Sequence, residues 1–407
     1  MKLEDSLRWL CDETRMLCSL SVSYGTAAAS ETLRRGLAQE VTLTDGAPVP
    51  RQRPISPDSL YDLASLTKFF AGVMAMLLVQ AGKLSLSEKV GVIDPRFVNM
   101  KDTTVFDLLC YRVSPQTAGR MDDGCSREEA LRRLFGAVPA QPPAVRVYSD
   151  MNAMIAKYVI EAKTGLPYVE ALRRFIFEPC GMTETFGAVP EALLPRCVCT
   201  NVEYQILSGE YRLRTEIPAG MPNDPKASLL CMGGRDLCGH AGLFSTERDM
   251  IRFCQALLGG ELLTRESLLT IGTDYTGRDN GDGTRRQSLG LLCFTRHPNQ
   301  VLSELPAWAG PHAIGLSGFT GNHLVLDPEA GVFELFLGNR VHNRVSRIVL
   351  RRGETLADYG LDARGAGLIR WPDGSRVPCS AQYIHQKDRC LHDPARERMQ
   401  ALGWMRP

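Results

Sequence analysis

The sequence predicts an α+β protein in which an antiparallel sheet, built from strands at both ends of the chain, is flanked by helices as an α/β sandwich. Strand patterns occur near the N-terminus, at 17–39, and return from about residue 287. The segments between them carry apolar residues mostly at helical spacing. This order predicts a single sheet with a mainly helical region inserted into it.

The chain length supports an insertion, because 407 residues exceed what one compact core usually needs. We expect residues 1–82 and 285–352 to form the sheet domain and residues 83–284 to form the inserted helical region. Residues 353–407 are expected to be a C-terminal extension that packs on the sheet domain.

The first elements are a helix, a strand and the hairpin partner of that strand. Residues 3–18 have leucines at helical spacing, LCSLSVSYG at 17–25 has a strand pattern, and SETLRRGLAQ at 30–39 is expected to pair with it. Residues 41–60 are rich in Pro, Asp and Ser, which predicts a loop.

A buried helix follows this loop. Residues 69–81, FFAGVMAMLLVQA, are apolar on every side, as in a helix enclosed by a large domain, and are too few to span a bilayer. Gly82 supplies a C-terminal stop. Ser65 and Lys68 stand three residues apart at the helix start, so their side chains share one face, a single turn apart.

Further helices are expected through the middle of the chain, with Ser245 or Thr246 as the N-cap of the last. The predicted helical segments are 85–97, 103–113, 126–138, 151–165, 168–182 and 248–258. Residues 186–235 give weak signals and are expected to be irregular.

The C-terminal part changes to strand patterns. Runs at 287–296, 312–328 and 331–341, separated by Asp-Pro, Gly and Asn, predict an antiparallel meander. Residues 342–360 are predicted to be a helix on this sheet, and a hairpin at 369–377 and a short helix complete the tail.

Charge and cysteine usage narrow the class of protein. The formal net charge is +1 with no long run of one sign, so no nucleic-acid partner is expected, and a small molecule or short peptide is the expected partner. The N-terminus lacks a signal-peptide core, and many of the 13 cysteines have apolar neighbours. We therefore expect a cytoplasmic protein with reduced thiols and no membrane partner.

Ser65 and Lys68 are the first candidates for chemistry. A serine hydroxyl becomes a good nucleophile only with an adjacent base and with donors for the oxyanion. Ser-x-x-Lys also occurs by chance, as a helix cap followed by a solvated lysine. Here Lys68 leads into a wholly apolar helix, so its ammonium needs a partner or a depressed pKa, which suits a base.

Two further stretches could belong to the same site. Tyr148, between a Pro-rich loop and a helix, could serve as a general base beside a lysine, or be a half-buried tyrosine at a helix start. The stretch GLSGFTG at 315–321 has glycines that allow close approach of a ligand or of another backbone segment. A β-bulge would give the same glycine pattern.

In this order the three stretches match the Ser-x-x-Lys, Ser/Tyr and Lys-Thr-Gly motifs of penicillin-recognising serine hydrolases. From about residue 15 to 350 the sequence resembles the class C β-lactamase-related family, which includes penicillin-binding proteins, D-alanyl-D-alanine carboxypeptidases, D-aminopeptidases and esterases. The supporting phrases include YDLASLTKFFAGVMAMLLVQAGKLSLSEKV, YSDMNAMIAKYVIEAKTG and LCGHAGLFSTERDMIRF. The resemblance implies a β-lactamase/transpeptidase-like fold.

The resemblance also implies residue roles. Ser65 matches the acylated nucleophile, Lys68 the amine that activates it, and Tyr148 the base of acylation and deacylation. The backbone N–H groups of Ser65 and Phe319 would form the oxyanion hole. Asp150 stands where class C β-lactamases carry asparagine.

The sequence departs from the family pattern at two places. Leu316, followed by Ser317 and Gly318, stands where a lysine or histidine usually meets a substrate carboxylate, so weak β-lactam turnover is expected. The loop beside the site contains Arg112, which is a candidate replacement for the missing cation.

Other candidates carry weaker signals. His240, in GHAG, either borders the cleft or bonds to backbone. Cys379, His385, Cys390 and His392 match no common zinc spacing, so neither a metal nor another cofactor is expected.

Two functions from different classes remain. The first is a serine hydrolase that forms an acyl-enzyme on Ser65 and hydrolyses a small ester or amide. The second is a non-catalytic relative that keeps the fold as a binding or scaffolding module. The altered third motif favours the second function, and retention of Ser65, Lys68 and Tyr148 opposes it.

Overall fold

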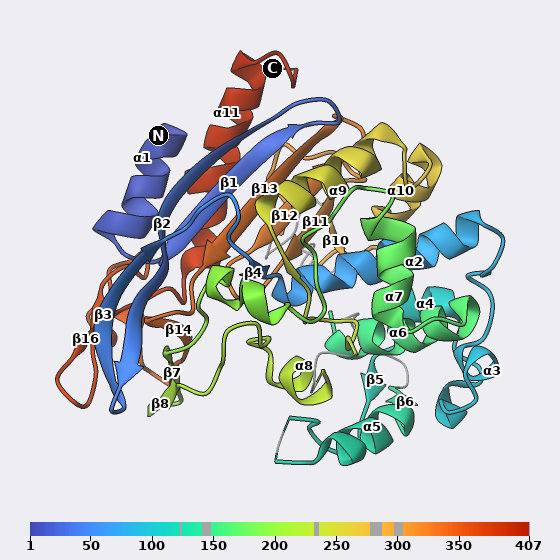
Figure 1. The fold of residues 1–407 in the computed structure, drawn as a ribbon, viewed down its shortest axis with the longest axis horizontal. Helices are drawn as coiled ribbons and strands as arrows, with labels where there is room; N and C mark the ends of the chain where they lie inside the picture. The colour runs from blue at the N-terminus through green and yellow to red at the C-terminus, as the bar shows by residue number, and fades with distance from the viewer. Residues whose placement is uncertain (123, 141–147, 232–235, 277–286, 297–303, 407) are drawn as a thin grey trace.

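The computed structural model describes residues 1–122, 124–140, 148–231, 236–276, 287–296 and 304–406. Its centre is a seven-stranded antiparallel sheet in the order β10-β11-β12-β13-β1-β2-β3. β1 pairs with β13, so strands from both ends of the chain lie side by side (Figure 1). The predicted fold class is therefore confirmed.

The two faces of this sheet carry different layers because successive strand side chains point to opposite sides. Leu20 and Phe336 pack with α1 and α11 on one face, and Leu335 belongs to the larger core shared with α2 and α9 on the other. The sheet strands are β1 Ser19–Thr26, β2 Ser30–Thr44, β3 Ala47–Pro54, β10 Phe294–Thr295, β11 Ile314–Ser317, β12 His323–Asp327 and β13 Val332–Asn339.

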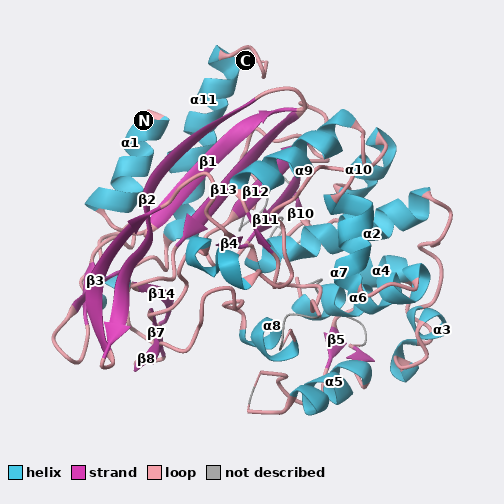
Figure 2. Ribbon diagram, in the orientation of Figure 1, coloured by secondary structure: helices cyan, strands magenta, loops and turns pink. Residues whose placement is uncertain are grey.

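Helices dominate the other half of the molecule (Figure 2). α2 is buried almost throughout and contacts α6 and α10, as its apolar sequence predicts. The helices are α1 Leu3–Arg8, α2 Thr67–Gln80, α3 Val90–Ile93, α4 Val105–Leu109, α5 Arg127–Phe135, α6 Asp150–Thr164, α7 Tyr168–Leu172, α8 Pro225–Leu230, α9 Glu247–Gly259, α10 Arg265–Ile271 and α11 Asp393–Ala401. Among the described residues, no helix is both long and apolar enough to cross a membrane.

Four smaller sheets complete the architecture, and the order β14-β7-β8 is the one that matters for the site. In it β14 runs parallel to β7, and β7 and β8 form a hairpin. The strands of the smaller sheets are β4 Tyr61–Asp62, β5 Pro115–Gln116, β6 Val138–Pro139, β7 Glu203–Leu207, β8 Glu210–Arg214, β9 Phe244–Ser245, β14 Arg344–Val349, β15 Leu368–Arg370 and β16 Arg376–Pro378.

The predicted loop at 41–60 is wrong, because β2 and β3 continue to residue 54. Asp45 and Gly46 both have positive φ, at 49° and 78°, and form the tight turn that an Asp-Gly pair favours in a hairpin. The prolines of β3 are tolerated because β3 is an edge strand, and one side of an edge strand has no neighbouring strand that needs its N–H donors.

Two further predictions are corrected by the β14-β7-β8 sheet. Residues 186–235, expected to be irregular, contain the hairpin β7–β8, whose turn is Ser208-Gly209. Residues 342–360, expected to be a helix, contain strand β14, because Val345 packs with Tyr204 in a separate apolar cluster. Only the short turn Leu356–Tyr359 of that segment is helical.

The predicted strand at 287–296 is short in the structure, since only Phe294–Thr295 belongs to the sheet. The N–H groups of Leu291 and Leu292 bond instead to carbonyls of Ile271 and Leu109, so this apolar run packs between helices. The predicted cap of α9 is Thr246, whose hydroxyl accepts the Asp249 N–H. The expected boundary at 284–285 lies outside the described residues.

The C-terminal segment adds the expected hairpin, β15–β16, and the expected helix, α11. α11 lies against β1, and Arg398 pairs with Glu4 of α1, so the two chain ends are neighbours (Figure 1). None of the described cysteines is joined in a disulfide.

Candidate active site

Ser65 lies in a tight turn that joins β4 to α2. Ala64 has φ +47°, a left-handed conformation that an alanine adopts only when its surroundings impose it. Asp62 supplies that constraint, because its carboxylate accepts the N–H groups of Ala64 at 2.9 Å and Asn223 at 2.7 Å. The turn therefore fixes Ser65 at the N-terminal end of a buried helix.

Lys68 is fully buried one turn after Ser65, with 0% of its surface exposed. Its Nζ lies 2.7 Å from Ser65 Oγ, 2.8 Å from Asp150 Oδ1 and 3.3 Å from the carbonyl of His240. Burial would lower the pKa of Lys68, but Tyr148 and Asp150 outweigh it and hold the pKa above its usual value. Lys68 is therefore an ammonium. The sequence allowed either a charge partner or a depressed pKa, and the structure shows the charge partner, Asp150.

Tyr148 lies on the other side of this ammonium. Its ring stacks on Phe294 with centroids 4.9 Å apart and lies 5.7 Å from the ring of Tyr111, and Lys68 Nζ is 4.8 Å from its centroid. Burial raises the pKa of Tyr148, while Lys68 and Ser65 act in the opposite direction. The phenol oxygen lies near Lys68 and Ser65, but it makes no hydrogen bond of normal geometry with the described residues.

The Lys68 ammonium belongs to a ring of charged groups. Asp150 Oδ2 lies 2.8 Å from Lys226 Nζ, Lys226 lies 3.7 Å from Asp224, and Asp224 Oδ1 lies 2.9 Å from His240 Nε2. The His240 carbonyl closes the ring by accepting from Lys68. Burial opposes a positive charge on the His240 imidazole, but Cys238, Asp224 and Asp150 outweigh burial and raise the pKa of His240 to about 10. The imidazole is therefore charged at neutral pH.

The same ring contains the group of described residues that could hold a metal ion, namely Asp150, Asp224 and His240. The oxygens of its two carboxylates are already in contact with the Lys226 and Lys68 ammoniums and with the His240 ring. Because these cations balance the carboxylates, the donor set is that of an ion-pair network.

Strand β11 approaches the Ser65 turn closely through Gly318. A Cβ atom at this position would lie 2.7 Å from the Leu63 carbonyl, so only glycine allows this contact. Thr320 and Asn322 donate to the carbonyl of Asp62 at 2.8 and 2.7 Å, which ties the loop after β11 to the nucleophile turn. Phe319, which follows Gly318, has a half-exposed ring that lines a cleft together with Ser65.

Neither Leu316 nor Ser317 lines this cleft. Leu316 is fully buried in the main core. Ser317 Oγ lies 2.8 Å from His323 Nδ1 and 2.8 Å from Lys387 Nζ, and it also donates to Glu304. Since Lys387 comes from the C-terminal extension, Ser317 connects β11 to that extension.

Arg112 is not brought to the cleft either. Its guanidinium lies 4.8 Å from the ring centroid of Phe106 and 3.8 Å from Asp107, both on α4. Of the predicted site residues, the structure brings together Ser65, Lys68, Tyr148, Asp150 and His240, with Gly318 and Phe319 beside them.

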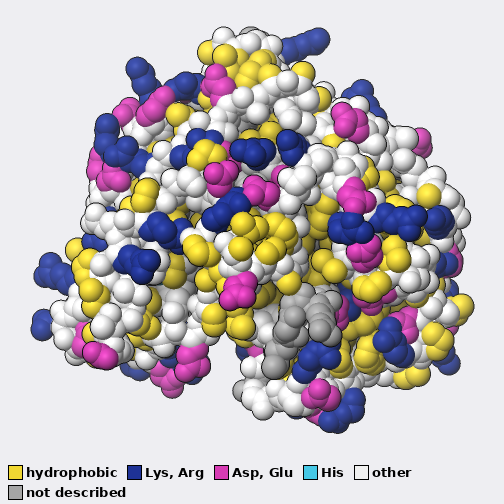
Figure 3. Space-filling view, viewed as in Figure 1, with side chains coloured by type: hydrophobic (Ala, Val, Ile, Leu, Met, Phe, Trp, Pro, Cys, Tyr) yellow, Lys and Arg dark blue, Asp and Glu magenta, His cyan; other side chains and the backbone are white. Residues whose placement is uncertain are grey.

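The cleft at Ser65 has a volume of about 770 Å³. One of its walls is the β14-β7-β8 sheet, and a second is the start of α8 with Asp224 and Lys226. A neighbouring hollow that shares Lys226 is lined by Tyr148 and Asp150. On the face shown in Figure 3, basic and acidic side chains are interspersed over the surface.

Sequence reasoning missed Lys226, Asp224 and the hairpin wall. The hairpin had a usable signal, because EYQIL and EYRLR alternate in polarity around Ser-Gly, the pattern of a two-residue turn. Asp224 had the signal of an N-cap before Pro225. Nothing local indicated that Lys226 contacts Asp150.

Comparison with known proteins identifies the family. The profile of the beta-lactamase family matches residues 29–358, well over half of the chain. A putative D-alanyl-D-alanine carboxypeptidase of Escherichia coli (strain K12) is 27% identical over 331 residues, covering 71% of this chain and 70% of its own. A protein of the same description from Salmonella gallinarum is 28% identical over 314 residues, covering 71% of each chain.

Solved structures share the fold. A mutant simvastatin synthase from Aspergillus terreus superimposes with a TM-score of 0.65 at 16% identity, covering 97% of each chain. EstCE1, described as a hydrolase with promiscuous acyltransferase activity, gives a TM-score of 0.64 at 16% identity, over 83% of this chain and 92% of its own. A class C beta lactamase from Rhodobacter sphaeroides gives 0.60 at 18% identity, over 84% of this chain and 94% of its own. The chain belongs to the beta-lactamase family, a family of serine hydrolases with carboxypeptidase and esterase relatives.

Proposed function

We propose that this protein is a serine hydrolase that forms an acyl-enzyme on Ser65 and transfers the acyl group to water. The observation that carries the proposal is the contact of Ser65 Oγ with Lys68 Nζ at 2.7 Å, with the buried phenol of Tyr148 beside both groups. The substrate class is a small ester or amide, including peptides with a D-residue, which suits a cleft of about 770 Å³.

Tyr148 is the proposed general base. Burial raises the pKa of Tyr148, so the resting side chain is the phenol and the reactive form is the phenolate. The phenolate accepts the proton of Ser65 as Oγ attacks the substrate carbonyl, and the resulting phenol gives that proton to the leaving group when the acyl bond breaks. In deacylation the phenolate takes a proton from water, hydroxide attacks the acyl carbon, and Ser65 regains its proton as it departs. The Lys68 ammonium stabilises the phenolate through both steps.

The N–H groups of Ser65 and Phe319 are the proposed oxyanion hole. Ser65 lies at the start of a buried helix, where N–H groups have no carbonyl partner inside the helix. The close approach of Gly318 to Leu63 supports this assignment, because it brings the residue after Gly318 beside the Ser65 turn. Asp150 has the proposed role of holding Lys68 in its charged form.

The competing function is a non-catalytic binding module, which the apolar Leu316 favours. Hydrolysis of 4-nitrophenyl acetate and butyrate by wild type and Ser65→Ala separates the two. The proposal predicts Ser65-dependent turnover, and equal rates for the two proteins would support the binding module. D-aminoacyl amides tested with the same pair of proteins would show whether amides are cleaved. We also propose a cytoplasmic location, which is supported by the 13 cysteines, none of which is described in a disulfide.

A further inference from the structure

The wall of the Ser65 cleft carries a row of polar side chains across three strands. In the order β14-β7-β8, Arg347 pairs in register with Gln205, and Gln205 pairs with Arg212. Residues directly opposite on neighbouring strands point to the same face of a sheet. All three residues line the cleft together with Ser65 and Phe319.

The three arginines of this wall differ in their hydrogen-bond and ion-pair partners. Arg214 is held by Glu203 at 2.7 Å and by the carbonyl of Asn223 at 2.9 Å. Arg212 pairs with Glu210, and both side chains are more than half exposed, so this ion pair is weak and easily exchanged. Arg347 is exposed and has no hydrogen-bond or carboxylate partner among the residues that the structure describes.

The carboxylates that line the same cleft are already neutralised. Asp122 pairs with Arg120, and Asp224 pairs with His240 and Lys226. Among the described residues that line the cleft, the guanidinium groups therefore face no unpaired carboxylate. A guanidinium fork matches a carboxylate through two parallel hydrogen bonds. The Gln205 amide already donates one N–H to Glu203 at 2.8 Å, and its second N–H can add a third donor.

We propose that the cleft selects substrates that carry a carboxylate and that Arg347, assisted by Arg212 and Gln205, binds it. This inference rests on the proposed acyl transfer at Ser65, since it assigns the substrate class of that site. The β14-β7-β8 wall thus supplies the cation that binds the substrate carboxylate. Strand β11, where relatives carry a lysine or histidine, has the apolar Leu316 instead.

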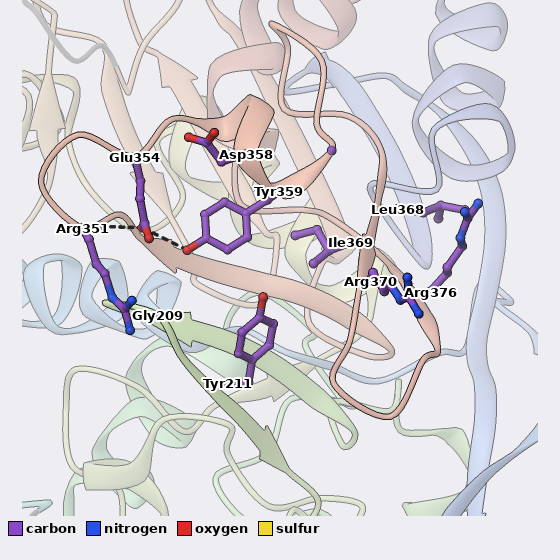
Figure 4. A pocket seen from close by; sticks show the side chains of 11 residues that line it. Gly209, Tyr211, Arg351, Glu354, Asp358, Tyr359, Leu368, Ile369, Arg370 and Arg376 are labelled. Atoms are coloured by element: carbon purple, nitrogen blue, oxygen red, sulfur yellow. Dashed lines mark hydrogen bonds between the residues drawn. The ribbon is translucent and has the colours of Figure 1, made fainter.

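The opposite face of the same sheet provides a matched control. Tyr211, next to Arg212 on β8, lines a separate hollow of about 860 Å³ that shares no lining residue with the Ser65 cleft. Figure 4 shows Arg370 and Arg376 side by side there, on paired positions of the β15–β16 hairpin. Arg370→Gln removes the same charge as Arg347→Gln from outside the cleft.

The test compares substrates that differ only in a carboxylate. For the acyl side the pair is the mono-4-nitrophenyl ester of adipic acid and its methyl ester, and for the leaving group it is 4-carboxyphenyl and 4-carbamoylphenyl butyrate. The ratio of kcat/KM for the anionic over the neutral member is measured in wild type, Arg347→Gln, Arg347→Glu and Arg370→Gln. Thermal unfolding midpoints confirm that each variant is folded.

We expect the wild-type protein to prefer the anionic member of one substrate pair. Which pair shows the preference tells whether the carboxylate is bound on the acyl side or on the leaving-group side of the substrate. Arg347→Gln should lower the preference about tenfold, mainly through KM, Arg347→Glu should lower it further, and Arg370→Gln should leave it unchanged. Added salt should weaken the wild-type preference.

Two results would overturn the inference. Ser65-dependent turnover with ratios that are the same in wild type and Arg347→Gln for both substrate pairs would remove the carboxylate site while leaving the proposed function intact. Absence of any Ser65-dependent turnover with all four substrates and the simple esters would remove both.

Discussion

Replacing Asp150 by asparagine tests the electrostatic account of the site, because it removes one charge and keeps the side-chain shape. Asp150 Oδ1 lies 2.8 Å from Lys68 Nζ, and the negative charge raises the pKa of both Lys68 and Tyr148. Without that charge, both pKa values should fall. A working base of lower pKa moves the rising limb of the pH–rate profile to lower pH, and an earlier loss of the Lys68 proton moves the falling limb the same way.

The size of the effect follows from Coulomb's law. A unit charge pair in contact, with an effective dielectric constant of about 20, interacts by about 4 kcal/mol, which corresponds to about 3 pKa units. The Asp150 side chain is 29% exposed and also contacts Lys226, so its influence is divided and partly screened. We therefore expect the profile of kcat/KM to shift down by about 1 to 2 pH units.

The assay is the pH dependence of kcat/KM for a neutral 4-nitrophenyl ester, corrected for spontaneous hydrolysis. Asp122→Asn is the matched control, because Asp122 lines the same cleft but pairs with Arg120. It should leave the profile in place. An unchanged profile in Asp150→Asn, or a shift to higher pH, would refute the assigned charge states.

Three further predictions concern single residues. Tyr148→Phe should lower kcat by about 10² to 10⁴ in steady-state ester hydrolysis, since it removes the general base, and full activity would exclude that role. Lys387→Met should lower the free energy of unfolding in urea by about 3 kcal/mol, because it leaves the largely buried Glu304 without its cation. Lys101→Met, at an exposed position, should have little effect, and equal stabilities of the two variants would contradict the ion-pair network around Glu304. Nitrocefin hydrolysis should be slow in wild type because a β-lactam holds its carboxylate near the acyl carbon, beside the strand where Leu316 replaces a cation, and turnover typical of a β-lactamase would show this expectation to be wrong.

The sequence was sufficient for the parts of the structure that local patterns determine. The all-apolar α2, the Ser65 and Lys68 spacing at its start, and strands at both ends of the chain are properties of single segments. The order of three motifs then placed Tyr148 and the 315–321 strand at the same site. The structure brings Tyr148 beside Lys68 and Gly318 against the Ser65 turn.

The remaining features arise from contacts between distant segments. The charge of Lys68 depends on Asp150, and the ring of charges depends on Lys226, which lies 76 positions further along the chain. The sequence predicts a helix where the structure has strand β14, because the pairing of β14 with β7 is parallel and joins segments far apart in sequence. The sequence predicts Ser317 at the substrate site, but its hydroxyl lies on the other face of the sheet, where Lys387 of the extension donates to it.

Labelling with a fluorophosphonate probe tests most directly whether Ser65 is the nucleophile. Intact-protein mass spectrometry followed by peptide mapping should find a single adduct on Ser65 in the wild-type protein and no adduct in Ser65→Ala. The Lys68→Met variant should react more slowly, because the ammonium beside Ser65 Oγ is lost. Labelling that persists undiminished in Ser65→Ala would contradict the account at its centre.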